Sequence, residues 1–174
     1  MFPCTKLPRF GRLDPASQLA LLAVEKLGVN FDALPRERVA ICLAAQAGSL
    51  STDIEFWRGR NGTGGPSPTL FAYTLPSAAI GEIAIRHRLT GPNLCLTGDS
   101  RAVLPEAADL LRRGEADYCV GVFCNVISAS AAAMISLPKS ASASAVFLQF
   151  GGSGLADLGE FDRDMEVLCA KFRA

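Results

Sequence analysis

The 174-residue sequence contains a single histidine and no Cys-x-x-Cys pair among its six cysteines. Because structural zinc sites cluster four Cys or His ligands at short spacings, we expect no metal site built by this chain alone. Cys42, Cys95 and Cys119 each lie within an apolar run. A thiol in such a run behaves as a small hydrophobic group, so buried, reduced, structural thiols are predicted at these three positions.

Net charge is also lacking, since 17 basic residues balance 17 acidic ones. Without a broad electrostatic field the chain is not expected to bind nucleic acid or an anionic membrane surface. No uninterrupted apolar run approaches the length of about 18 residues that spans a bilayer. The first ten residues mix two prolines with charged residues and contain no apolar signal region, so a cytoplasmic protein is expected.

What is present is typical of one folded domain. Hydrophobic residues make up 49% of the chain and charged residues 20%, which argues against intrinsic disorder. The length corresponds to about one average domain, so residues 1–174 are predicted to form a single domain.

Short apolar runs alternate with segments of helical spacing along the chain. The apolar runs predict buried strands at residues 39–45, 93–97, 118–123 and 144–150. Helices are predicted at residues 13–27, from 51 or 52 to 57, at 76–86 and at 103–113. The alternation predicts the α/β class, with a mainly parallel sheet covered by helices. Pro105 is expected to shift the start of the last helix, because proline lacks a backbone donor.

Two segments between these elements have a biased composition. Residues 59–65 form a glycine-rich loop that lacks the Walker lysine and does not lead from a strand into a helix. We therefore predict a flexible connection rather than a nucleotide cradle, and no cofactor. Residues 128–144 are a low-complexity stretch of serine and alanine, for which no element is predicted before the strand at 144.

The segment from Thr97 to Ala102 joins a predicted strand to a predicted helix. Such junctions expose a side chain beside backbone N–H groups, which suits a nucleophile and an oxyanion. Residues 98–102 loosely resemble the Gly-x-Ser-x-Gly elbow of α/β-hydrolases, with Ser100 as nucleophile. In those enzymes the histidine base follows the serine, whereas His87, expected to be a solvated residue at a helix end, precedes it. Ser100 is thus predicted to lack a base.

Four short patterns in order extend this comparison. They are the glycine-rich segment 62–68, the small-residue helix 79–84, the junction 96–100 and the Leu-Leu-Arg-Arg-Gly-Glu-Ala-Asp-Tyr segment 110–118. In this order and spacing they resemble the N-terminal half of a β-ketoacyl synthase, the thiolase-fold condensing enzyme of fatty acid and polyketide assembly. The resemblance spans residues 48–125 and implies a thiolase-like half-fold with a mixed, mostly parallel sheet of about five strands.

The departures from the family concern the catalytic groups. Asp99 stands where active ketosynthases carry the nucleophilic cysteine. A carboxylate suits a helix N-terminus but is a poor acyl acceptor, and Cys95, four residues earlier in mid-strand, cannot replace the missing thiol. The family's histidine pair comes from a second half that this sequence does not contain. No catalytic residue is therefore expected, with Ser100 as the alternative nucleophile, and the face left by the second half is expected to be apolar.

The resemblance implies a non-catalytic subunit similar to a chain-length factor, which pairs with an active ketosynthase or with itself. It would support fatty acid or polyketide-type chain assembly together with an acyl carrier protein. In the family the strand matching residues 93–97 meets its counterpart across a two-fold axis, so a homo- or heterodimer is expected. Two alternatives stay open: an acyl-thioester enzyme that uses Ser100, or Asp99 with Arg101 as anion partner, and a structural or regulatory binding module unrelated to acyl chains.

Overall fold

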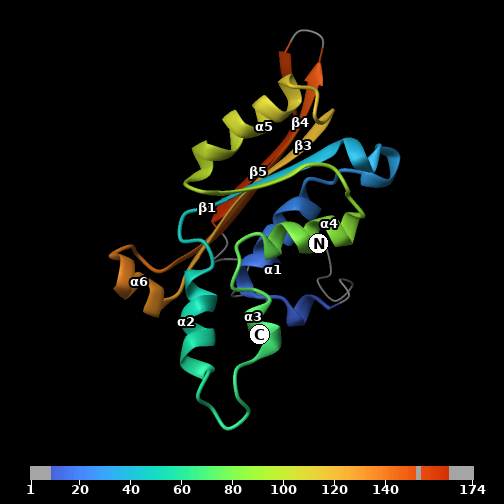
Figure 1. Ribbon diagram of the computed structural model, residues 1–174. Coiled ribbons are helices and arrows are strands. Elements are labelled where there is room, and N and C mark those ends of the chain that lie inside the picture. The colour runs from blue at the N-terminus through green and yellow to red at the C-terminus, as the bar shows by residue number, and fades with distance from the viewer. Residues whose placement is uncertain (1–8, 152–153, 165–174) are drawn as a thin grey trace.

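A computed structural model describes residues 9–151 and 154–164, which form one mixed sheet with helices on both faces (Figure 1). The strands are β1 (Val39–Ala45), β2 (Asn93–Thr97), β3 (Tyr118–Ile127), β4 (Ser140–Gly151) and β5 (Gly154–Asp164). The helices are α1 (Pro15–Lys26), α2 (Leu50–Gly59), α3 (Pro68–Phe71), α4 (Ala78–His87), α5 (Val103–Arg112) and α6 (Ala129–Ile135). Single 3₁₀ turns are η2 (Phe10–Arg12), η3 (Phe31–Ala33), η4 (Arg36–Arg38) and η5 (Ser100–Ala102).

The strand order in the sheet is β2-β1-β3-β4-β5. Strand β1 is parallel to both β2 and β3, whereas β4 is antiparallel to β3 and to β5. Four of the five strands therefore run in one direction, which confirms the predicted α/β class and the mostly parallel mixed sheet. Strand β2 is one edge of this sheet and β5 is the other.

The bounds of β1 and β2 agree with the predicted strands, because both are short apolar runs between turn residues. All seven residues of β1 are buried, as a central strand covered on both faces requires. The serine and alanine stretch divides into α6, whose first turn is capped by Ser128, and the beginning of β4. The spacing of Phe161, Met165, Leu168 and Cys169 predicts a short amphipathic tail; its residues 161–164 belong to β5, and the rest of it lies outside the described residues.

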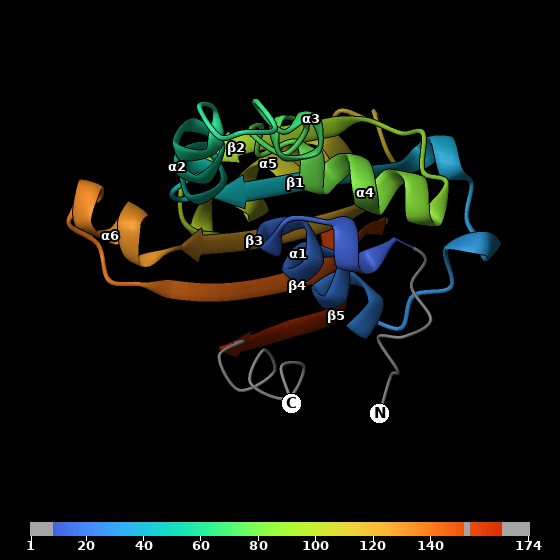
Figure 2. The same ribbon diagram turned by 90° about the horizontal axis from the view of Figure 1, so that it is seen from below.

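Helices α1 and α4 cover one face of the sheet, and α5 covers the other (Figure 2). Gly121 in β3 lets α5 approach closely, since a Cβ there would lie 2.7 Å from Val103 Cγ1 and 2.8 Å from Val146 Cγ1. Turn η5 comes before α5, which begins at Val103 as predicted, so the expected shift of this start by Pro105 is not observed. Pro105 therefore occupies the first turn, where its missing N–H removes no intrahelical bond.

Candidate functional site

The candidate site lies where β2 ends, at the carboxyl edge shared by the three parallel strands β1, β2 and β3. Gly98 follows β2, and its amide donates to the Ala45 carbonyl at the end of β1 (3.3 Å). Asp99 then takes the N-cap position of η5, with extended backbone angles. In open α/β sheets this edge is where ligand-binding side chains gather.

The Asp99 carboxylate forms an ion pair and hydrogen bonds with Arg101. Its Oδ1 accepts from the Arg101 backbone amide at 3.0 Å, and its Oδ2 accepts from Arg101 Nε at 3.0 Å and Nη2 at 2.6 Å. The side-chain and backbone hydrogen bonds from Arg101 lower the pKa of Asp99, so the carboxyl group is ionised at neutral pH. An ionised carboxylate here is no acyl acceptor and repels a developing oxyanion.

Ser100 is exposed on η5, and in the described part of the chain its hydroxyl has no hydrogen-bond partner. The structure therefore brings Ser100, Asp99 and Arg101 together in one turn, but it adds no base to them. A serine without a base is a weak nucleophile.

His87, the last residue of α4, lies far from this turn. His87 precedes β2 in the chain and Asp99 follows it, and the strand between them is about 16 Å long. The expectation of a solvated histidine is wrong, because the His87 side chain is only 14% exposed. Phe31 from the η3 turn covers it, with ring centroids 4.5 Å apart, and Nε2 lies 3.7 Å from Glu25 Oε1 without a hydrogen-bond partner.

Burial is the main reason why the pKa of His87 is lowered, with the Arg86 charge adding to it and Glu25 opposing it. The imidazole therefore stays neutral in the folded state more readily than in the unfolded chain. We expect full stability above about pH 6.5, the unperturbed histidine value, and declining stability as the pH falls below it. Since His87 is the only histidine, urea unfolding between pH 7.5 and 5.5 should show this decline in the wild type and a flatter profile in His87→Gln. If the stability of the wild type and of His87→Gln declined equally with falling pH, burial of a neutral His87 would not be the cause of the decline.

None of the four cysteines in the described ranges offers a replacement thiolate. Burial raises the pKa of Cys42, Cys119 and Cys124 to about 12, and it also raises the pKa of Cys95. Cys42 and Cys119 are buried as predicted, whereas Cys95 is only half-buried because β2 is an edge strand. The cysteines therefore act as packing groups, since the thiol rather than the reactive thiolate is favoured.

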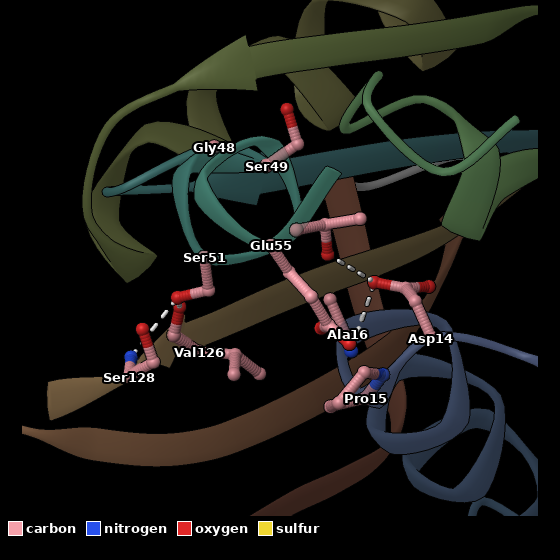
Figure 3. Close-up of a pocket in the computed structure, with 10 residues that line it drawn as sticks. Asp14, Pro15, Ala16, Gly48, Ser49, Ser51, Glu55, Val126 and Ser128 are labelled. Atoms are coloured by element: carbon pink, nitrogen blue, oxygen red, sulfur yellow. Dashed lines mark hydrogen bonds between the residues drawn. The ribbon is translucent and has the colours of Figure 1, made fainter. Parts of the chain in front are cut away.

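A second polar feature was not foreseen from the sequence (Figure 3). A cavity of about 110 Å³ opens beyond β1 and β3 and is lined by Asp14, Pro15, Ala16, Gly48, Ser49, Ser51, Thr52, Glu55, Val126 and Ser128. Ser51 Oγ donates to the Val126 carbonyl and accepts from the Ser128 amide, both at 2.9 Å, while Asp14 caps α1. These polar groups already bind one another, so the cavity is a structural junction of α1, α2 and β3.

Other expectations concern ligands and membranes. Among the described residues, no three potential metal ligands converge. The glycine-rich loop after α2 is exposed and lies between α2 and α3. In the described ranges, none of the helices combines the length and the apolar character that a bilayer crossing requires.

Comparisons with known proteins agree with this architecture. The chain is similar to the ishigamide ketosynthase/chain length factor, with 27% identity over 73% of this chain and 38% of that one, at a TM-score of 0.64. A ketosynthase in complex with its chain length factor from Xenorhabdus doucetiae has 21% identity over 86% of this chain and 64% of that one, with a TM-score of 0.69. A type II polyketide synthase acyl-carrier protein in complex with its ketosynthase has 15% identity over 86% of this chain and 50% of that one, with a TM-score of 0.68.

The chain thus spans between about a third and two thirds of the length of these solved chains. No curated protein sequence matches it. The family model of the β-ketoacyl synthase N-terminal domain matches residues 5–145, which is most of the chain. The fold, the order of the motifs and this match together show that the chain belongs to the β-ketoacyl synthase family and corresponds to its N-terminal domain.

Proposed function

We propose that this protein is a non-catalytic ketosynthase-like subunit that supports fatty acid or polyketide-type acyl chain assembly by pairing with an active ketosynthase. One observation supports the proposal: at the junction that the motif order matches to the family's nucleophile, Asp99 accepts hydrogen bonds from Arg101 in a turn that contains no thiol and no histidine. Residues 1–174 would act as one domain in this role. An acyl carrier protein would bring the growing chain to the pair.

The edge strand β2 supports the pairing step. Its residues are half-exposed or exposed, and its outer side has no neighbouring strand in the described sheet. An unpaired edge is a template for another strand, and proteins that do not use such an edge usually cover or charge it. The five residues of β2 carry no charge. Pairing across this edge would satisfy the outward backbone groups.

The test is co-expression with an active ketosynthase and an acyl carrier protein from the same genome. Native mass measurement of the purified material should give a complex of the chain with the ketosynthase. Chain assembly by the ketosynthase should lose activity or change product length when the subunit is omitted. A chain that stays a free monomer beside an active ketosynthase, with unchanged products, would refute the proposal.

The alternative of altered thioester chemistry at Ser100 has its own test. Because Ser100 lacks a base, we expect wild type and Ser100→Ala to hydrolyse acyl thioesters at the same background rate. Asp99→Asn serves as the matched variant for the carboxylate in the same turn. Hydrolysis that is clearly above background in the wild type and drops at least tenfold in Ser100→Ala would make the protein an enzyme.

A further inference from the structure

Large apolar side chains are exposed on the α2–α3 arm, which we define as residues 56–75. Trp57 is 63% exposed, Phe71 61% and Leu75 64%. Three exposed side chains of this size within twenty residues are more than the scattered apolar residues of an ordinary surface. In Figure 2, α2 and α3 lie on the same side of the molecule as the edge strand β2, and Figure 1 shows that the arm extends away from the sheet.

The arm is held in shape although its apolar residues face solvent. Phe56 of α2 packs against Phe71 of α3, with ring centroids 5.4 Å apart. The Arg60 guanidinium lies 3.7 Å from the centroid of the Trp57 ring and also donates to the Trp57 carbonyl. Trp57 is thus oriented before any partner arrives, and an ordered tryptophan–arginine stack is typical of interface hot spots.

The charge on the arm has one sign. From residue 56 to residue 81 the sequence contains Arg58 and Arg60 and no aspartate or glutamate. Neither arginine forms an ion pair with any described residue, and Arg58 donates only to the Ser130 hydroxyl, at 2.6 Å. Among the described residues, five other arginines are paired with carboxylates, and Arg9, Arg12, Arg88 and Arg112 are unpaired like Arg58 and Arg60. An apolar patch with two arginines free of carboxylates complements an apolar surface flanked by acidic residues.

We propose that the α2–α3 arm is the specificity contact with the paired ketosynthase, which meets Trp57, Phe71 and Leu75 with apolar side chains and Arg58 and Arg60 with carboxylates. This inference rests on the proposed function and deepens it. The β2 edge supplies backbone pairing, which any strand could satisfy. The arm supplies the side-chain recognition that selects one partner.

The experiment uses Trp57, the only tryptophan in the chain, as a local probe. The fluorescence of this protein is recorded while a tryptophan-free variant of the ketosynthase is added to it. The dissociation constant of the complex is then measured at two salt concentrations. Binding should shift the Trp57 emission to the blue. Trp57→Ala and the double variant Arg58→Glu/Arg60→Glu should each weaken binding at least tenfold, and the double variant should also lose most of the salt dependence.

Matched controls lie on other elements. Ile85→Ala removes an equally exposed apolar side chain from α4, and Arg112→Glu reverses an exposed charge on α5; both should bind as the wild type does. Circular dichroism checks that every variant is folded. A complex that forms with unchanged Trp57 emission and unaffected variants would overturn the arm assignment and leave the proposed function standing. The absence of any complex would refute the proposed function, and the inference with it. A Trp57 shift caused by self-association alone would overturn the choice of partner.

Discussion

Cys95→Pro is expected to weaken the complex with the ketosynthase about 100-fold or more while the chain keeps its fold. The Ile41 amide donates to the Pro92 carbonyl at 2.9 Å, and the parallel register places Cys95 opposite Leu43. In such a ladder β1 bonds to Pro92, Leu94 and Leu96, so the Cys95 N–H points away from β1. Proline at this position would remove an outward donor and block the edge with its ring, at a cost of about 3 kcal/mol.

The measurement is a dissociation constant together with a thermal unfolding curve for each variant. Cys95→Ala is the matched control, because it removes the half-buried thiol but leaves the backbone donor in place. We expect it to bind like the wild type, with a small loss of stability from the lost packing. If Cys95→Pro is folded and binds with unchanged affinity, the subunit does not pair through β2.

Gly91→Ala is expected to destabilise the fold by about 3 kcal/mol or more, the range of severe core defects. The turn before β2 passes so close to the start of β1 that a Cβ on Gly91 would overlap the Val39 carbonyl and lie 3.1 Å from the Glu37 carbonyl. These are backbone atoms, and Val39 is fully buried, so no side-chain rotation can relieve the overlap. The edge strand β2 would have to move away from β1.

Urea unfolding of Gly91→Ala should show the transition at a much lower concentration than in the wild type, or no folded protein. Gly81→Ala is the matched control, since it makes the same change within α4, where a Cβ would meet nothing within 4 Å. There alanine should raise stability by about 0.5–1 kcal/mol, because it favours the helix more than glycine does. Equal effects of the two substitutions would show that the turn at Gly91 is not closely packed.

The sequence alone predicts that the candidate site has no nucleophile, whereas the hydrogen bonds of Asp99 come from the structure. The order of motifs predicts Asp99 at the position that matches the family's nucleophile, because that order depends on local residues only. Two nitrogens of the Arg101 guanidinium donate to Oδ2 of Asp99, and this contact depends on the η5 turn and on how the arginine side chain folds back. The contact lowers the pKa of this carboxyl group, and both side chains stay exposed to solvent.

The sequence by itself determined the positions of β1 and β2 and the start of α1 at Asp14 and Pro15, and it predicts Asp99 at the position that matches the family's nucleophilic cysteine. These features depend on short-range patterns: apolar runs, a residue that caps a helix, and short motifs that follow one another in a fixed order. Only the tertiary structure decided that β2 is the open edge, that His87 is buried against Phe31 and that the arm exposes Trp57. Strand order and burial arise from contacts between residues far apart in the chain, and local patterns do not encode which distant segment will cover which side chain.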